Sequence, residues 1–226
     1  MGQRPLCKDP NSLCRILSNE GRLTKLKWLG RLVLALAATS GTFFYLTFVY
    51  GFAMIAVTNF EAGVAAWTIR GALICMVLFF AMRILNPNLK GSTLELAKSF
   101  WLTGGLLSLL HAIATMAFYH QFQHAAAYQD TAHQTEQAIG VAIGFGIWFN
   151  YIFVVIWLMD ALWMSGFSKS YFARHRAFNW TIYGFLSFIA FNGAIVFESG
   201  PVRWIGILAI LTLVVIWKTY RKHNKE

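Results

Sequence analysis

Two histidines with helical spacing are the residues of this chain best suited to chemistry. His120 and His124 stand four positions apart, and on a continuous helix that spacing puts both rings on one face. Paired imidazoles are common ligands of transition metals such as zinc. The sequence therefore makes these two histidines candidate metal ligands. The stretch after His120 contains Ala and Gln but no Gly or Pro up to Ile139, so the helix is expected to continue beyond the bilayer or to bend along its surface.

Further metal ligands can come from neighbouring acidic and imidazole side chains. The candidates are Asp130, His133, Glu136 and Glu198. The zinc-protease motif is excluded, because it requires Glu directly after the first histidine and Gln121 occupies that position. The alternative is that both histidines bind only water, lipid head groups and nearby loops.

Haem fits this histidine pattern less well than a metal ion does. A haem with two histidine ligands in a helical bundle usually takes them from different helices. Here His111 and His120 share one apolar stretch and point in nearly opposite directions around it. A haem with one ligand from this chain stays open. No catalytic residues are assigned, because the nucleotide-binding, nucleophile-elbow and Cys-x-x-Cys motifs are missing from the sequence.

The elements that position these residues are predicted to be membrane helices. The 226 residues are 58% apolar and only 12% charged, whereas soluble domains carry about a quarter charged residues. A disordered protein is therefore excluded, because disorder requires low hydrophobicity, and an ordinary soluble enzyme is not expected. A bilayer-spanning helix needs about 20 apolar residues, and six stretches approach or exceed this length: 29–52, 64–85, 100–121, 138–163, 177–197 and 204–220. We expect an all-α domain over 28–220, between a basic segment (1–27) and a basic tail (221–226).

The basic residues orient this predicted six-helix bundle. The net charge is +10, and 17 of the 19 Lys and Arg residues lie in or beside segments on one side of the predicted topology. Because cytoplasmic loops are rich in Lys and Arg, both termini are expected in the cytoplasm. The same distribution favours attraction to anionic lipid rather than nucleic acid. The expected partners are the bilayer and other membrane subunits.

Polar residues inside the predicted spans are candidates for function, because lipid makes them costly. They are Arg70, His111, Asn150, Asp160 and Asn192. Arg70 is expected to extend outward to water, or to pair with Glu61, Glu136 or a bound anion. Together with Asn192 it would wall an outward-opening polar cavity beside the histidine pair. Asp160 is expected to accept hydrogen bonds from Asn179, Trp180 or loop amides, or to pair with Arg83 or Arg174.

Glycines and aromatic residues are assigned to packing and to the membrane interface. Gly140 and Gly144 have the spacing that allows close helix contact, and Gly146, Asn150 and Trp157 are expected to face the bundle interior. Tryptophans and a tyrosine near the span ends are interpreted as an aromatic belt: Trp28, Trp101, Trp163, Trp204 and Tyr220.

Two segments carry a resemblance to known proteins. One contains Tyr119, His120, His124, Tyr128 and the Thr131 and Thr135 region, and the other contains Phe149-Asn150-Tyr151 followed by Trp157, Asp160 and Trp163. This pattern resembles uncharacterised bacterial multi-pass membrane proteins with an outer His-x-x-x-His and a Trp-x-x-Asp-x-x-Trp segment. The resemblance covers about 50 residues and implies a bacterial inner-membrane location without an activity.

Three functional hypotheses follow from the sequence. The first is a non-enzymatic inner-membrane protein that binds a metal, haem or small ligand at its outer face, or that serves as a subunit of a membrane complex. The second is a proton- or ion-coupled transporter that uses the polar residues within the spans. The third is a subunit of a membrane redox enzyme.

Overall fold

The computed structural model describes residues 60–223, and in that part of the chain it contains helices and no strands. Five helical stretches are long and apolar enough to cross a membrane, so the protein has the character of a multi-pass membrane protein. They correspond to the second to sixth predicted spans. The first predicted span, 29–52, and the basic segment 1–27 lie outside the described residues, which leaves the predicted count of six untested.

The five long helices follow the apolar pattern of the sequence. They are α2 (Phe60–Leu85), α3 (Gly91–Phe118), α5 (Gly146–Gly166), α7 (Arg176–Phe191) with the five-residue π-helix η1 (Asn192–Val196), and α8 (Gly200–His223). Pro87 stands in the connection after α2, where it cannot donate the backbone hydrogen bond that a continuing helix requires. At a rise of about 1.5 Å per residue even the shortest of these stretches is long enough to cross the hydrocarbon layer.

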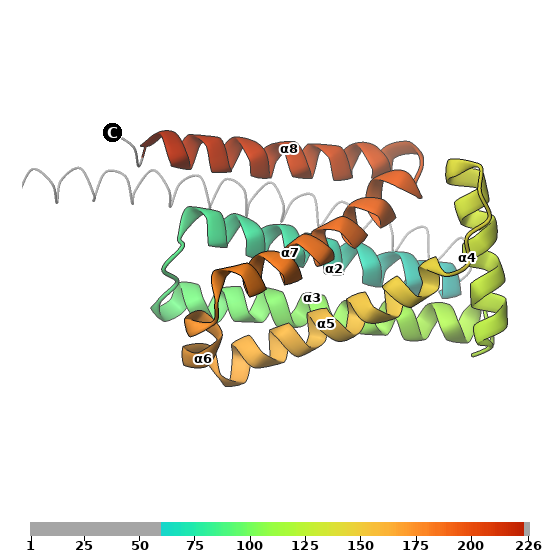
Figure 1. Cartoon of the computed structure of the whole chain (residues 1–226), viewed down its shortest axis with the longest axis horizontal. Coiled ribbons are helices and arrows are strands. Elements are labelled where there is room, and N and C mark those ends of the chain that lie inside the picture. The colour runs from blue at the N-terminus through green and yellow to red at the C-terminus, as the bar shows by residue number, and fades with distance from the viewer. Residues whose placement is uncertain (1–59, 224–226) are drawn as a thin grey trace, which may run out of the picture. The chain divides into compact units, whose positions relative to one another are not determined.

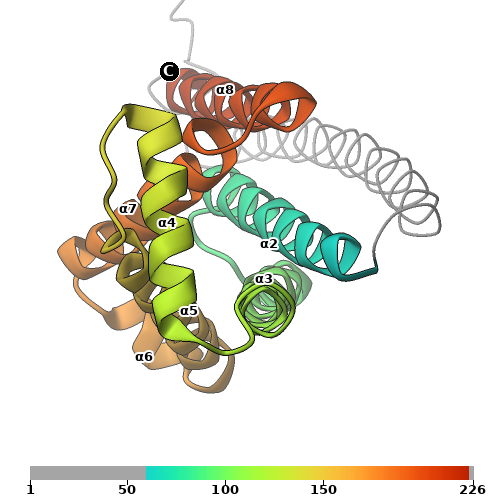
Figure 2. The ribbon, with the colours of Figure 1, turned by 90° about the vertical axis from the view of Figure 1, so that its right-hand side faces the viewer.

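Two shorter helices mark opposite ends of this helical bundle. In Figure 1, α4 (His124–Ile139) lies across the end where α3 finishes and α5 starts, whereas α6 (Ser168–Ala173) lies at the other end. Figure 2 shows α4 crossing in front of α5. We call these the α4 end and the α6 end. The α2–α3 connection and the carboxyl end of α8 also lie at the α6 end (Figure 1).

A sharp turn separates α3 from α4. Gln121 and Phe122 both adopt positive φ angles, of 48° and 57°, which non-glycine residues rarely do. The turn is held by hydrogen bonds from Phe122 N to Met116 O (2.8 Å) and from Gln123 N to His120 O (2.7 Å). The expectation of one continuous helix through His120 and His124 is therefore wrong, and the alternative, a helix that bends across the bundle end, describes α4.

The fourth predicted span starts too early. Gly140 caps α4 in a left-handed conformation with φ 78°, and α5 begins only at Gly146. Gly140 and Gly144 therefore do not form a contact stripe on one helix. Gly144 instead lies against Tyr128, and a Cβ atom there would be 2.3 Å from the tyrosine ring. These two glycines shape the connection that folds α4 back onto α5.

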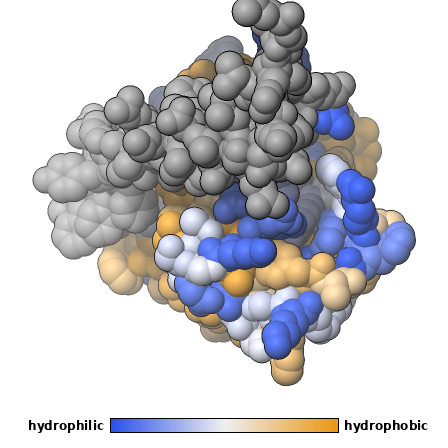
Figure 3. All heavy atoms as spheres, turned by 90° about the vertical axis from the view of Figure 1, so that its left-hand side faces the viewer, coloured by the Kyte–Doolittle hydropathy of each residue, from blue (hydrophilic) through white to orange (hydrophobic). Residues whose placement is uncertain are grey.

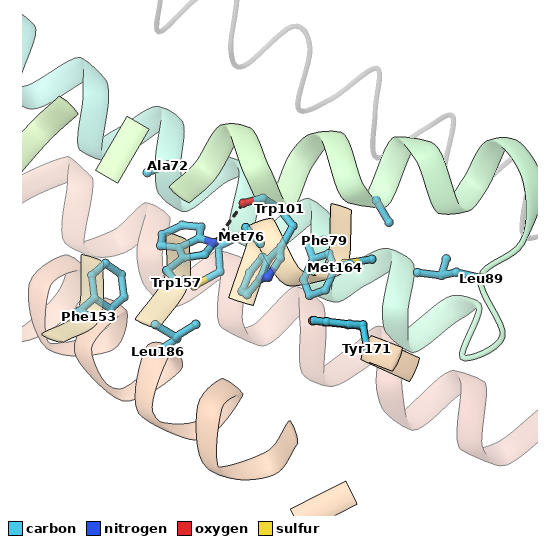
Figure 4. Packing of buried hydrophobic residues seen from close by; sticks show 12 residues of the cluster. Ala72, Met76, Phe79, Leu89, Trp101, Phe153, Trp157, Met164, Tyr171 and Leu186 are labelled. Atoms are coloured by element: carbon cyan, nitrogen blue, oxygen red, sulfur yellow. Dashed lines mark hydrogen bonds between the residues drawn. The ribbon is translucent and has the colours of Figure 1, made fainter. Parts of the chain in front are cut away.

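Large aromatic residues fill the space between α2, α3 and α5. Phe79 stacks on Trp101 with 4.1 Å between ring centroids, and Trp157 Nε1 donates to the Trp101 carbonyl oxygen at 3.1 Å (Figure 4). Gly104 makes this contact possible, because a Cβ atom there would be 2.5 Å from Trp157 Cζ2. Trp101 is completely buried, so its assignment to an interfacial aromatic belt is wrong.

The outward faces of the long helices are apolar. Exposed aliphatic and aromatic side chains recur at helical spacing on α3, α5 and α8: Leu106, Leu110 and Ile113; Ile152, Val155, Met159 and Leu162; and Trp204, Leu208, Leu211 and Val215. Stripes of this kind are suited to contact with lipid tails.

Candidate functional site

Polar side chains gather at both ends of the bundle. The Asp160 cluster, at the α6 end, consists of Trp101, Asp160, Tyr171, Arg174, Asn179 and Tyr183. The α4-end group consists of His120, His124, Tyr128, Asp130, Trp148 and Tyr151. The residues of the first group are buried or half-buried, whereas those of the second are exposed except for the half-buried His120 and Tyr151. This difference gives the two groups different chemical possibilities.

The carboxylate of Asp160 is the centre of the buried cluster. Its Oδ2 accepts hydrogen bonds from Trp101 Nε1 and from the Tyr171 hydroxyl, both at 2.8 Å. Its Oδ1 accepts from Arg174 Nη1 in an ion pair. Three segments of the chain, α3, α6 and the α6–α7 connection, therefore converge on one carboxylate from α5. Such complete pairing is what makes a buried charge tolerable.

Arg174 ties the start of α7 to the same centre. Its Nε donates to Asn179 Oδ1, and its guanidinium lies over the Tyr171 ring, 3.8 Å from the ring centroid. The ring centroids of Trp163 and Phe178 also lie near the guanidinium, each 5.4 Å from Arg174 Cζ. Cation–π contacts of this kind are worth about 2 kcal/mol or more when water is excluded.

Tyrosine hydroxyls extend the cluster towards α7. The hydroxyls of Tyr171 and Tyr183 are 2.8 Å apart. Burial, followed by the nearby Tyr183 and the negative charge of Asp160, raises the pKa of Tyr171 far above its usual range. Tyr171 is thus held as a neutral donor to Asp160, which supports a structural role for its hydroxyl.

The sequence identified part of this cluster. Arg174 was one of the expected partners of Asp160 and does contact it. Asn179 binds Arg174 instead, Arg83 donates to Pro87 O at 2.9 Å, and Trp180 is exposed. Trp101, Tyr171 and Tyr183 were missed as partners. Their spacing from Asp160 carries no signal, because the contact depends on how separate helices cross.

The predicted metal ligands at the α4 end are divided by the turn after α3. His120 lies in the turn, with its Nε2 4.0 Å from Asp130 Oδ2. His124 starts α4, and its Nδ1 is 3.2 Å from the Tyr151 hydroxyl. The ring of His124 also lies 4.9 Å from the Trp148 ring. Thus each histidine has its own partners, in place of a shared helical face.

The further candidate ligands are scattered over the same end. His133 Nε2 is 3.3 Å from Gln137 Nε2, Glu136 is exposed, and the backbone oxygen of Glu198 accepts from Arg203 Nε at 2.8 Å. Among residues 60–223, no three His, Cys, Asp or Glu side chains gather closely enough to hold a metal ion. In residues 60–223 the candidate ligands of the predicted metal site are therefore not brought together as one set.

The other polar residues of the predicted spans have separate surroundings. His111 Nδ1 donates to Ala65 O at 2.8 Å, which joins α3 to α2. Asn192 Nδ2 donates within its own helix to Phe188 O at 2.7 Å. The Arg70 guanidinium lies 5.6 Å from the Trp67 ring centroid. Asn150 is exposed, so its expected place in the bundle interior is wrong.

Comparison of the chain with protein-family models, with curated proteins and with solved structures finds no match.

Proposed function

We propose that the protein is a non-enzymatic multi-pass protein of the bacterial inner membrane that binds a ligand at its α4 end. The observation that carries this proposal is the contrast between the two polar groups. The side chains of Asp160 and His111 form hydrogen bonds with other helices of the same chain. The side chains of His124 and Asp130 are exposed, so they can reach a ligand without opening the bundle.

A transition-metal ion is the ligand class that this group suits best. His120 offers an imidazole nitrogen, and Asp130, 4.0 Å from it, can act as an oxygen ligand or can orient the ring. His124 and His133, on the adjoining helix α4, are the further nitrogen ligands that a bound metal would have to recruit, because no three such side chains lie together among residues 60–223. A small organic ligand is the second class, because Trp148 and Tyr128 add exposed aromatic surface beside His124.

The transporter alternative is less well supported by the placement of its residues. It requires a polar path that links His111, Asn150 and Asp160. His111 is engaged with α2, Asn150 faces outward, and Asp160 is enclosed by donors at the opposite end of the bundle. The redox alternative requires a haem or flavin, which an absorbance spectrum of the purified protein detects.

Membership in a larger membrane assembly is the second candidate function. Among the described residues of α7, only Leu186 is buried, and Ile216 is the single buried hydrophobic residue described in α8. These helices therefore offer wide apolar faces that suit either lipid or another subunit. Chromatography with light scattering after mild solubilisation separates a single chain from an assembly.

The proposed orientation places the α6 end in the cytoplasm. Exposed cations of this end include Lys90, Lys169, Arg176, Lys218 and Lys222, whereas Glu61, Asp130, Glu136 and Glu198 belong to the α4 end (Figure 1). Positive charge on the cytoplasmic side is the general rule for membrane proteins. The ligand site would then face the outside of the inner membrane.

The binding proposal is tested first on the unmodified protein. The purified full-length chain is equilibrated in turn with zinc, copper and nickel salts, washed, and assayed for metal content and for absorbance. The proposal expects retention of one of these metals. If no metal is retained and no haem band appears, the metal and haem forms of the proposal are contradicted.

A further inference from the structure

The segment between α5 and α7 carries positive charge for which residues 60–223 supply no second acidic partner beside Asp160. Between Gly146 and Phe197 the sole acidic residue is Asp160, and it is already paired with Arg174. Lys169 and Arg176 remain, and both are exposed. Elsewhere at this end, the Glu95 carboxylate is 2.9 Å from Lys98 Nζ on α3. The cations of the connection are therefore free to bind an anionic group at the surface.

Exposed aromatic residues are close to these cations in sequence. Phe167 and Trp180 are each 70% exposed, and they flank Lys169 and Arg176 in sequence. Trp side chains favour the head-group layer, where one edge of the ring is wet and the other apolar. Lys and Arg can lay their apolar stems along the same surface and extend their charges to the phosphates. The combination is typical of an interfacial segment.

A third segment adds a cation to the same surface. The Arg83 guanidinium lies over the Phe172 ring, 5.3 Å from its centroid, which places the end of α2 beside α6. Phe172 itself is exposed. We call Arg83, Lys169, Phe172, Arg176 and Trp180 the α6 corner. Figure 3 views this end of the molecule and shows hydrophilic residues beside hydrophobic ones.

The Asp160 cluster fixes the position of the α6 corner. Tyr171 anchors α6 through Asp160, and Arg174 joins the connection to both α5 and α7. Lys169 and Arg176 therefore belong to a part of the chain whose backbone is held in place by buried contacts. Preorganisation of this kind lowers the entropic cost of binding a head group.

We propose that the α6 corner binds the head groups of anionic phospholipids, with Arg83, Lys169 and Arg176 as the phosphate-binding cations. This proposal is independent of ligand binding at the α4 end. Anionic lipid is the chosen occupant because its phosphate matches the unneutralised cations and its acyl chains match the exposed rings. Each Lys or Arg that lies at the bound head group contributes about 1 kcal/mol to the attraction of anionic lipid, which corresponds to about fivefold in affinity.

Native mass spectrometry of the full-length chain in detergent tests this proposal. Phosphatidylglycerol and phosphatidylcholine are titrated separately, and the bound lipid is counted. The double variant Lys169→Gln, Arg176→Gln should bind phosphatidylglycerol about 25-fold more weakly than the unmodified protein. The matched control Lys218→Gln, Lys222→Gln removes the same charge from the tail of α8 and should change binding less than about twofold if the site is local.

Three results would overturn the proposal. They are equal binding of the two lipids, unchanged phosphatidylglycerol binding by the Lys169/Arg176 variant, and an equal loss in the α8 control. Inorganic phosphate is added as a competitor, and displacement of the lipid at equal concentration would assign the site to free phosphate instead. Because the substituted side chains are exposed, the thermal midpoint without lipid should stay unchanged, which verifies that the variants are folded.

Discussion

Arg174 and Asp160 form an ion pair whose two side chains are 4% and 1% exposed. The pair joins α5 to the connection before α7, and Trp101 and Tyr171 complete the surroundings of the carboxylate. A buried charge is costly until it is fully paired. The relationship therefore explains how an aspartate can lie in an apolar helix and at the same time hold three other segments in place.

Removal of either partner of this pair should destabilise the fold. Arg174→Met and Asp160→Leu each leave one buried charge unpaired, at an expected cost of about 3–5 kcal/mol. The double variant removes both charges and should lose clearly less than the sum. Thermal unfolding in detergent measures all three.

Arg176→Met is the matched control for Arg174→Met. It removes the same side chain two positions later, from an exposed site, and should change stability by less than about 0.5 kcal/mol. Additive losses in the double variant, or equal effects of the two arginine variants, would contradict a buried structural pair.

Close packing of α3 against α5 should depend on Gly104, because glycine has no Cβ atom. A Cβ atom there would be 2.5 Å from Trp157 Cζ2, whereas at Gly184 in α7 it would meet nothing within 4 Å. Gly104→Ala should therefore cost about 1–3 kcal/mol through overpacking. Gly184→Ala should instead gain up to about 1 kcal/mol from helix propensity. The same sign of change for both variants in thermal unfolding would refute the contact.

The alkaline behaviour of Tyr171 should differ from that of an exposed tyrosine. Its folded pKa is raised, chiefly by burial, so the folded protein holds the phenol proton more tightly than the unfolded chain does. The stabilising contribution is complete below the unfolded pKa of about 10 and is lost as the pH rises above it. Alkaline loss of stability should consequently be smaller in Tyr171→Phe.

Tyr128→Phe is the control for the substitution, because it removes the same hydroxyl from an exposed tyrosine. Phenolate absorbance is followed in parallel. Tyr171→Phe should leave the phenolate absorbance gained by the folded protein near pH 10 unchanged. A loss of that absorbance in Tyr171→Phe would show that Tyr171 ionises normally.

The sequence was informative where apolar length determines the structure. Five predicted spans match long helices in residues 60–223 because a bilayer demands uninterrupted apolar runs. The sequence was misleading at Gln121 and Phe122. Both adopt positive φ angles, but neither is a glycine, which is the residue that usually indicates such a turn. It was also misleading at Trp101, since an aromatic residue near a span end can face the core as well as the interface. Contacts among Asp160, Tyr171 and Tyr183 depend on helix crossings that residue spacing does not encode.

The proposed orientation predicts the behaviour of reporter fusions. Green fluorescent protein fused after Glu226 should fluoresce, because the tail follows the basic end of α8 and should lie in the cytoplasm. Alkaline phosphatase inserted at Val141, in the connection between α4 and α5, should be active outside. The reverse pair of results would place the α6 end outside and contradict the orientation.

Metal binding at the α4 end is the central claim, and metal analysis of matched histidine variants tests it most directly. His120→Ala and His175→Ala are purified beside the unmodified protein, since His175 is an exposed histidine at the opposite end that caps α7. After equilibration with each metal and washing, the unmodified protein and His175→Ala should retain the same stoichiometric amount, and His120→Ala should lose most of it. Equal metal content in all three proteins, or none in any, would contradict metal binding at the α4 end.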